Sequence, residues 1–442
     1  MNVHRLAVSA ALAAALAAPL ALVPAGPAGP AGAATPPSLP QTAAVGSAAS
    51  WLAAQIGPDG SIPSTTTPGS PDLTATANAA LALASAGPAD HATALSALTF
   101  MEGHVSDYVA DGGTDGPGQL ALLILDAHAL NVPTATFGGT DLVARLLATQ
   151  QATGPDAGLF GAQDATFDGA YRQGLSLAAL AAVGRTGGAA ETAAESWLTG
   201  QQCPDGGWTS LVTTANPCNG KPAQYAGPDT NSTALAVEGL EAQGALTPAA
   251  ASSALHFLKR AEDPDGGWGY EPHSPGSTDP DSTSLVIQAL LALGPPPSST
   301  ALTRSGIDPV ASLLADQVTS GPGTGGIAFP GISGADLLAT YQAIPALAGV
   351  TFAYDLGTPV VTKVSPARGP RAGGTVVHLA GTSLTEVTSV SFGGVPAASF
   401  TVVSSTVVTA VTPPGAVGTV TVTVASPTGA SSPTTADRFT YR

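Results

Sequence analysis

Aspartates followed by hydroxyl or amide side chains recur along residues 42–350, each just before an apolar run. The clearest cases are Asp229-Thr230-Asn231-Ser232-Thr233 and Asp279-Pro280-Asp281-Ser282-Thr283. An aspartate in this position can accept hydrogen bonds from the free N–H groups at the start of a helix, where the helix dipole also favours a negative charge. A carboxyl group that does not cap a helix can instead bind a ligand or transfer a proton.

A turn motif recurs between these aspartates. Residues 195–208 (ESWLTGQQCPDGGW) combine an apolar helix face, two glutamines and a Pro-Asp-Gly-Gly turn closed by Trp208, and residues 254–268 (ALHFLKRAEDPDGGW) repeat the pattern. Weaker copies occupy residues 51–62, 97–113, 142–160 and 310–327. A period of about 50 residues with two helices per unit predicts stacked helical hairpins. We expect Gln201 and Trp208 to join neighbouring hairpins in the outer wall.

The two helices of each unit differ in polarity. The second helix, for example over residues 233–244 or 284–294, is apolar nearly all round and should be buried. The first carries charged residues such as Arg145, Lys259 and Arg260, so one of its faces should meet water. Six buried helices ringed by six amphipathic ones predict an all-α (α/α)6 toroid over residues 42–350.

In such a toroid the amino ends of the inner helices meet at one rim. A concave opening with a few converging polar groups is the expected place for a ligand. Asp115 belongs to this end as well. The side chains that we expect to contact a ligand there are Asp72, Asp168, Tyr171, Gln173, Tyr225, Asp229, Asn231, Trp268, Tyr270, Asp279, Asp281 and Asp336.

The turn that ends in Asp205-Gly206-Gly207-Trp208 resembles the QW repeat of squalene-hopene cyclases and the related repeat of protein prenyltransferase β subunits. The Asp-x-x-Ser/Thr-x-x-Ala-Leu elements are also similar to the inner helices of cobalamin carriers of the transcobalamin and intrinsic factor type. These families share the α/α toroid. The resemblance therefore implies that fold, with cobalamin or a polyprenyl-type lipid as the ligand.

The resemblance to cyclases also implies a catalytic motif. Class II cyclases protonate an alkene with the middle aspartate of DxDD and hold carbocations against aromatic faces. The nearest match is Asp279-Pro280-Asp281-Ser282, in which a serine replaces the last carboxylate, and aromatic residues make up only 5% of the chain. Asp279 and Asp281 are the catalytic candidates if the protein is an enzyme. Other α/α barrels hydrolyse glycosides with two inward carboxylates, which the rim could also supply.

Only two cysteines occur, Cys203 and Cys218. In an exported protein such a pair predicts a disulfide, which leaves no thiolate for the zinc site of the prenyltransferases. The seven histidines are scattered and none has metal-ligand spacing from a cysteine. We therefore expect no metal and no cofactor other than cobalamin as a possible ligand.

Residues 1–34 have the pattern of a signal peptide. His4 and Arg5 precede an apolar run over residues 6–23, and small residues that suit cleavage follow at 31–33. The run approaches the length of a membrane anchor, but it is mostly alanine and contains Pro19. Residues 35–41 would form a spacer, and no later segment is apolar for long enough to span a bilayer.

Charge excludes nucleic acid as a partner. The chain has a net charge of -17 and only 13 Lys plus Arg residues, so it lacks the basic surface that releases counterions from phosphates.

Beyond residue 359 the pattern changes to alternation with a period of two, as in residues 375–379, 390–392 and 420–424. Gly/Pro turns separate these runs, which predicts an all-β immunoglobulin-like sandwich of about 85 residues. The segments VTKVSPARGPRAGGTVVHLAGTSL and VSFGGVPAASF resemble an IPT/TIG domain over residues 359–442, joined by a linker at 351–358. In secreted bacterial proteins such a module implies a spacer or adhesion unit.

Together these patterns predict a secreted or cell-surface binding protein. Its toroid would capture a small apolar or amphipathic ligand at the inner-helix rim, and its partners would be that small molecule or a surface glycan or protein. The alternative is an extracellular enzyme on the same toroid, either terpene cyclase-like or carbohydrate-active. An interior filled by side chains would instead favour a structural surface protein.

Overall fold

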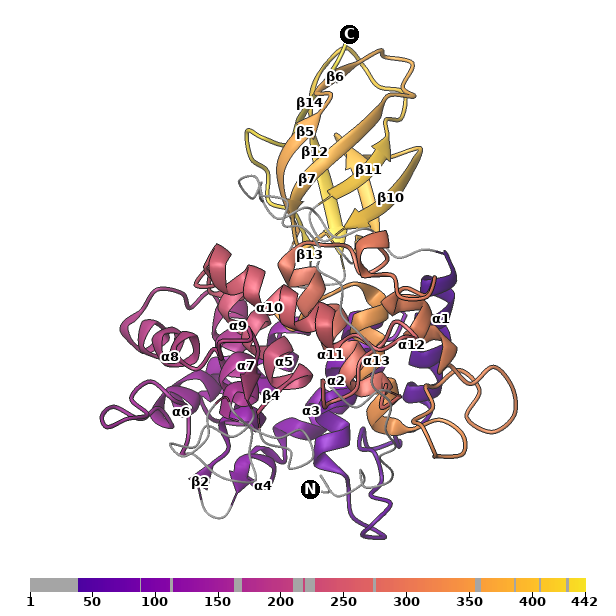
Figure 1. Cartoon of the computed structure of the whole chain (residues 1–442). Coiled ribbons are helices and arrows are strands. Elements are labelled where there is room, and N and C mark those ends of the chain that lie inside the picture. The colour runs from indigo at the N-terminus through magenta and orange to yellow at the C-terminus, as the bar shows by residue number, and fades with distance from the viewer. Residues whose placement is uncertain are drawn as a thin grey trace, which may run out of the picture.

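The computed structural model describes residues 39–442 apart from 88, 112–113, 163–168, 210–217, 219–226, 273–275, 354–358, 385–386, 405–406 and 427–428. The expected signal peptide lies outside the described residues. The first helix, α1 (Leu39–Ala53), begins within the segment expected to be a spacer. Helices occupy the first part of the chain and strands the second, and Figure 1 shows them as two separate bodies.

Six helices form a closed inner ring. Each packs against the next in the chain, and the last packs against the first, which closes the circle. These helices are apolar on nearly every side and bury most of their residues, as expected from their sequences. They are α2 (Leu73–Ala86), α5 (Pro117–Ala129), α7 (Gly169–Ala182), α9 (Thr230–Ala242), α11 (Pro280–Leu293) and α13 (Leu337–Ala348).

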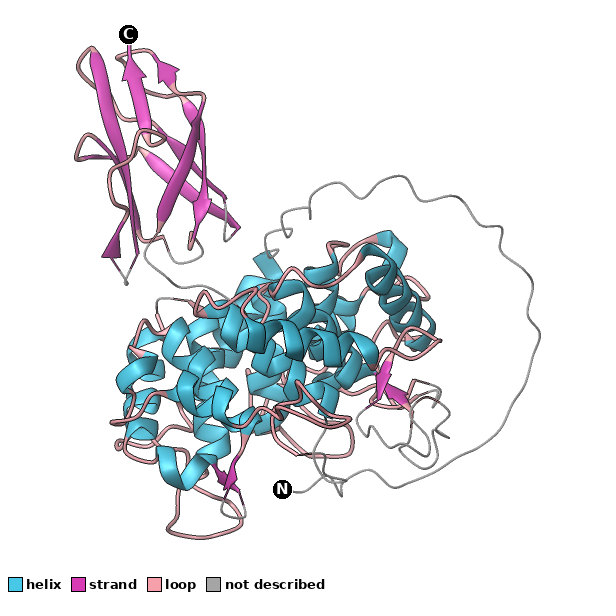
Figure 2. Ribbon diagram, turned by 90° about the vertical axis from the view of Figure 1, so that its left-hand side faces the viewer, coloured by secondary structure: helices cyan, strands magenta, loops and turns pink. Residues whose placement is uncertain are grey.

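A second layer of helices surrounds this ring, and Figure 2 shows the two layers packed together. Each outer helix contacts the inner helix that precedes it in the chain, and the first outer helix contacts the last inner helix. This arrangement confirms the predicted (α/α)6 toroid. The outer helices are α1, α3 (His91–Glu102), α6 (Leu142–Ala148), α8 (Ala189–Gly200), α10 (Pro248–Ala261) and α12 (Pro309–Ala315).

Short elements fill the connections between helices. A five-residue helix, α4 (Val105–Val109), precedes α5, and two-stranded ladders lead into α5 and α9. The ladders pair β1 (Ala110–Asp111) with β2 (Thr114–Asp115), and β3 (Trp208–Thr209) with β4 (Pro228–Asp229). Two 3-10 turns, Thr134–Thr136 and Thr300–Leu302, precede α6 and α12.

The glycines of the repeated turn let neighbouring hairpins touch. Gly206 has φ +98°, and a Cβ there would lie 2.1 Å from the carbonyl oxygen of Ser253 in α10. Gly325 has φ +99°, and a Cβ there would lie 2.6 Å from the carbonyl oxygen of Ser47 in α1. A side chain cannot occupy that space, so only glycine combines the left-handed backbone with this close approach. The second contact joins the last unit to the first.

Glutamines make the same connection by hydrogen bonding. The Nε2 group of Gln202 donates to the carbonyl oxygens of Gly206 (2.9 Å) and of Ala250 in α10 (3.1 Å). Gln317 donates in the same way to Gly325 (2.8 Å) and to Ala44 in α1 (2.9 Å). The expectation that Gln201 joins the hairpins is therefore wrong, because the neighbouring Gln202 makes the bridge.

The tryptophans bind the two helices of their own hairpin together. Trp208 and Trp268 are fully buried, and each indole Nε1–H donates to a carbonyl oxygen near the end of the preceding outer helix, that of Leu198 or Leu258, at 2.8 Å. Their backbone N–H groups donate to threonine hydroxyls of the following inner helix at 2.9 Å. The turn motif is thus part of the outer wall.

The carboxyl-terminal domain consists of two sheets packed face to face, which confirms the predicted immunoglobulin-like sandwich. One sheet has the order β10-β11-β7-β5 and the other β6-β14-β12-β8-β9, with β13 paired to β12. Alternate side chains of the two sheets, among them Val377, Leu379, Val422 and Phe439, form its core. The strands are β5 (Val360–Ser365), β6 (Arg368–Gly369), β7 (Val376–Thr382), β8 (Ser389–Phe392), β9 (Val395–Pro396), β10 (Ser399–Ser404), β11 (Val407–Val411), β12 (Gly418–Ser426), β13 (Gly429–Ala430) and β14 (Arg438–Tyr441).

Candidate functional site at the amino-terminal rim

Four of the rim aspartates cap inner helices. Asp72 accepts a hydrogen bond from the backbone N–H of Ala75 at 3.0 Å, and Asp336 from that of Ala339 at 3.1 Å. Asp229 and Asp279 accept from the backbone N–H of the serine three residues later, both at 2.7 Å. These contacts satisfy N–H groups that have no partner within the helix. The capping role expected from the sequence is therefore confirmed for these four.

Asp115 and Asp168 differ from these four. Asp115 forms a bidentate ion pair with Arg145, with nitrogen to oxygen distances of 2.6 and 2.8 Å, and α5 has no side-chain cap. Asp168 lies outside the described residues, as does Tyr225.

Asp281 differs from the four capping aspartates and from the ion-paired Asp115. It follows Pro280 in the first turn of α11, and its Oδ1 atom is buried without a hydrogen-bond partner in the described part of the chain. Burial, and then the nearby carboxyl groups of Asp279 and Asp336, raise the pKa of Asp281 to about 8. At neutral pH its side chain is therefore mostly a neutral carboxylic acid, which can donate a hydrogen bond or a proton.

The neighbouring Asp279 responds differently to the same surroundings. Burial raises its pKa to about 6, but hydrogen bonds from the backbone N–H and hydroxyl of Ser282 offset part of that effect. Ser282 stands where the last carboxylate of a DxDD motif would stand, and it is buried against Asp279. Asp281 therefore has one carboxyl neighbour in its own helix turn.

Tyr341 interacts electrostatically with Asp281 and with two other tyrosines. Burial, then the carboxyl group of Asp281, then the hydroxyls of Tyr171 and Tyr108 raise the pKa of Tyr341 well above its ordinary value. Asp72 adds to the same effect. These groups come from α2, α4, α7, α11 and α13, so the rim does gather side chains from distant parts of the sequence. Tyr108 lies in the short helix α4, outside the repeated pattern, and no sequence signal identified it.

The remaining predicted rim residues divide into two sets. Asn231 and Tyr270 both contact Thr230 at the start of α9. The hydroxyl of Thr230 donates to Asn231 Oδ1 (3.2 Å), and the backbone N–H of Thr230 donates to the carbonyl oxygen of Tyr270 (3.2 Å). Gln173 is fully buried. Its side-chain oxygen accepts a hydrogen bond from the backbone N–H of Phe160, and its Nε2 group donates to the carbonyl oxygen of Gly158, both at 2.9 Å. Gln173 and Trp268 thus make hydrogen bonds that stabilise turns of the outer wall. We had expected both residues to contact a ligand.

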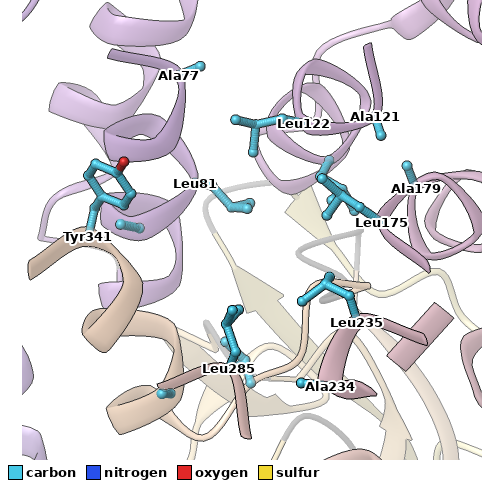
Figure 3. Close-up of a cluster of buried hydrophobic side chains, with 14 of the residues drawn as sticks. Ala77, Leu81, Ala121, Leu122, Leu175, Ala179, Ala234, Leu235, Leu285 and Tyr341 are labelled. Carbon is cyan, nitrogen blue, oxygen red and sulfur yellow. The ribbon is translucent and has the colours of Figure 1, made fainter. Parts of the chain in front are cut away.

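Below the rim, aliphatic side chains line the centre of the ring. Figure 3 shows Leu81, Leu122, Leu175, Leu235 and Leu285 on different inner helices around one central region. Their exposed fractions run from 0% for Leu235 to 7% for Leu175. Leu285 follows Asp281 by one helical turn and so lies on the same face of α11. The carboxyl group of Asp281 thus stands above an apolar floor.

Cys203 and Cys218 form the predicted disulfide. In the described part of the chain, no group of three or more His, Cys, Asp or Glu side chains is arranged to hold a metal ion. None of the described helices has the length and apolar character needed to cross a membrane.

Two family models match separate parts of the sequence. Residues 139–289 match the squalene-hopene cyclase C-terminal domain, and residues 359–441 match the IPT/TIG domain. The chain combines a squalene-hopene cyclase-like toroid with an IPT/TIG domain. The cyclase model ends after Asp281 and so includes the Asp279-Pro280-Asp281-Ser282 segment. No curated protein matches the sequence.

Several solved structures are similar to this cyclase-like toroid. The type II terpene cyclase MstE from Scytonema has a TM-score of 0.49 at 17% identity over 71% of this chain and 98% of its own. An inactive variant of the alpha-1,6-mannanase GH76A of Salegentibacter sp. HEL1_6, in complex with alpha-1,6-mannotriose, has a TM-score of 0.49 at 12% identity, over 70% of this chain and 98% of its own.

The plexin A4 extracellular region is similar over 19% of this chain and 8% of its own length, at 28% identity and a TM-score of 0.18. The toroid assignment rests on the closed ring of helix contacts and the family models, since these structural likenesses are distant.

Proposed function

We propose that the toroid binds a small apolar or amphipathic molecule at its amino-terminal rim, and that Asp281 donates a hydrogen bond to an acceptor on that molecule. The observation that carries this proposal is a carboxylic acid with a buried, unpartnered Oδ1 above an apolar floor. An unpaired buried polar atom costs free energy, which a ligand that supplies the missing partner would recover. The leucines beneath it would contact the apolar part of the ligand.

The disulfide supports a place outside the cytoplasm. Disulfides form and persist in oxidising compartments, which agrees with the signal peptide expected in residues 1–34. We therefore place the protein at the cell surface or beyond it, with the IPT/TIG domain as a spacer or adhesion unit.

The binding proposal can be tested with farnesol, a neutral polyprenyl alcohol, in calorimetric titrations across pH. The wild-type protein should bind farnesol at pH 6 to 7 and lose affinity above pH 8, because ionised Asp281 can no longer donate. Farnesol itself does not titrate in this range. Asp281→Asn keeps a donor of the same shape and should bind at every pH, whereas Asp281→Ala should bind more weakly by about tenfold.

Farnesol that does not bind the wild-type protein, or that binds Asp281→Ala as tightly, would contradict the proposal. A cap variant in the outer layer, Asp308→Asn, serves as the matched control, because it keeps the oxygen that accepts from the N–H of Ala311 and does not change a group that raises the pKa of Asp281.

Acid catalysis is the second candidate, and the raised pKa of Asp281 within the cyclase-like segment favours it. Asp281 would transfer its proton to a terminal alkene carbon, and the resulting carbocation would close a ring and return a proton. The product would be an isomer of the linear substrate. Asp281→Asn separates the two functions, because an amide keeps the hydrogen bond but cannot supply the proton. Isomers of farnesol formed by the wild-type protein and absent with Asp281→Asn would identify an enzyme.

A further inference from the structure

A second polar site lies at the opposite end of the toroid, where the inner helices end. A pocket of about 330 Å³ opens there between the last turns of α7, α9 and α11 and the segment that follows α13. Its walls include the small side chains of Ala182, Ala242 and Ala292, and Thr351 completes it. Its size is at the lower end of the range for small-molecule sites.

Glu238 is the buried polar group of this pocket. Its side chain lines the pocket and is only 2% exposed. One carboxyl oxygen, Oε2, accepts a hydrogen bond from the backbone N–H of Phe352 at 2.9 Å. The other, Oε1, is buried and has no partner among the described residues. The carboxyl group is therefore oriented by one oxygen, while the other is left without a hydrogen bond in the described part of the chain.

The surroundings of Glu238 favour a positive charge. Three helices end at the pocket, and helix carboxyl ends carry partial negative charge from their free carbonyl groups. Glu241, at the solvent-exposed edge, adds a second carboxylate, and the described lining residues include no Lys or Arg. Burial raises the pKa of Glu238 to about 8, so the surroundings disfavour its anion. A cation bound beside it would restore the ionised form.

We propose that this pocket binds a primary alkylammonium ion, whose N–H groups donate to Glu238 Oε1 and whose alkyl chain packs against the alanine walls. A primary ammonium fits better than a quaternary one, because the described lining has no aromatic face for cation–π contact and because Oε1 requires a hydrogen-bond donor. This site is separate from the amino-terminal rim and does not depend on the function proposed there.

The test is a calorimetric titration of the full chain with n-butylammonium chloride, and with butan-1-ol as the neutral analogue, at constant ionic strength. Butylammonium should bind and butanol should bind at least about tenfold more weakly, since a charge-assisted hydrogen bond is lost. Glu238→Gln keeps the acceptor for Phe352 N–H and should lower butylammonium affinity by about tenfold or more. Asp141→Asn, which also removes one carboxylate but lies at the start of the outer helix α6, should leave it unchanged.

A second variant guards against a change in folding. Ala292→Leu fills the pocket without altering charge and should also abolish butylammonium binding. Equal affinity for butanol, full affinity in Glu238→Gln, or no saturable binding to the wild-type protein would each overturn the proposal.

Discussion

The two rims of the toroid use carboxyl groups differently. At the amino-terminal rim, Asp72, Asp229, Asp279 and Asp336 direct their oxygens to the first N–H groups of the inner helices. At the carboxyl-terminal rim, helix ends offer carbonyl groups instead, so Glu238 finds one backbone donor beyond α13 and keeps one oxygen unpaired. Because helix starts supply donors and helix ends supply acceptors, a carboxyl group is readily satisfied at the first rim and poorly satisfied at the second. Asp281 is an exception, because it lies at the amino-terminal rim and yet its Oδ1 atom has no hydrogen-bond partner among the described residues.

The largest effect is expected from a substitution in the outer wall, which supports the helices of both rims. Trp268→Ala should lower the free energy of unfolding by about 3 to 5 kcal/mol, because it leaves a cavity and removes the bond to Leu258. Urea denaturation followed by circular dichroism measures the change. Leu338→Ala is the control, since Leu338 is 40% exposed and should matter little. A loss below about 1 kcal/mol for Trp268→Ala would place this tryptophan outside the wall.

The disulfide offers a way to weaken one rim alone. Cys203 and Cys218 are 15 residues apart in the loop before α9, so replacing both with serine should cost about 3 kcal/mol by chain entropy. We expect farnesol binding at the amino-terminal rim to suffer while butylammonium binding is preserved. Thermal melts with and without reductant measure the stability change, and reductant should not affect the double variant. Equal losses at both rims would show that they are not independent.

The pH dependence of stability should report both rims together. The pKa values of Asp281 and Glu238 are about 8 in the folded chain, against about 4 for such groups in unfolded chains. Between these values the unfolded chain loses protons that the folded chain keeps. Stability contributed by each group is therefore complete below pH 4 and falls as pH rises towards 8, by at most about 1.4 kcal/mol per pH unit.

Asp281→Asn and Glu238→Gln should each make the free energy of unfolding fall less steeply with pH, because each removes one of the two titrating groups. Their effects should add in the double variant, because the groups lie on opposite rims. Urea titrations at pH 5, 6, 7 and 8 provide the measurement. An unchanged slope in either single variant would show that the carboxyl group it replaces is ionised in the folded chain.

The smallest expected effect distinguishes the two aspartates at the start of α11. Asp279→Ala removes a helix cap and should cost about 1 kcal/mol, whereas Asp279→Asn should retain most of the stability. The Asp279→Ala substitution also removes a negative neighbour, so the pKa of Asp281 should fall, which carboxyl chemical shifts in a pH titration would show. An unchanged pKa of Asp281 in Asp279→Ala would mean that the Asp279 carboxyl group does not contribute to its value.

Much of the fold followed from local patterns. The period of the hairpins, the buried second helix and the alternation beyond residue 359 each reflect a local requirement of helix or strand, and the structure contains all three. The capping aspartates were also predictable, since a cap and its N–H partner lie three residues apart. The bridging glutamine was placed one residue too early, because the end of α8 decides which of Gln201 and Gln202 faces the next hairpin.

The sequence by itself determined which residues form hairpins, caps, the disulfide and the sandwich, because these features depend on short spacings or on residue type. Tertiary structure decided which carboxyl groups remain neutral. Asp279 and Asp281 look alike in the sequence, yet of the two only Asp281 has a buried oxygen without a partner among the described residues. Tyr108 and Glu238 gave no local signal at all. Their roles arise when closure of the ring brings separate helices together, because burial and neighbouring charge are properties of the whole fold.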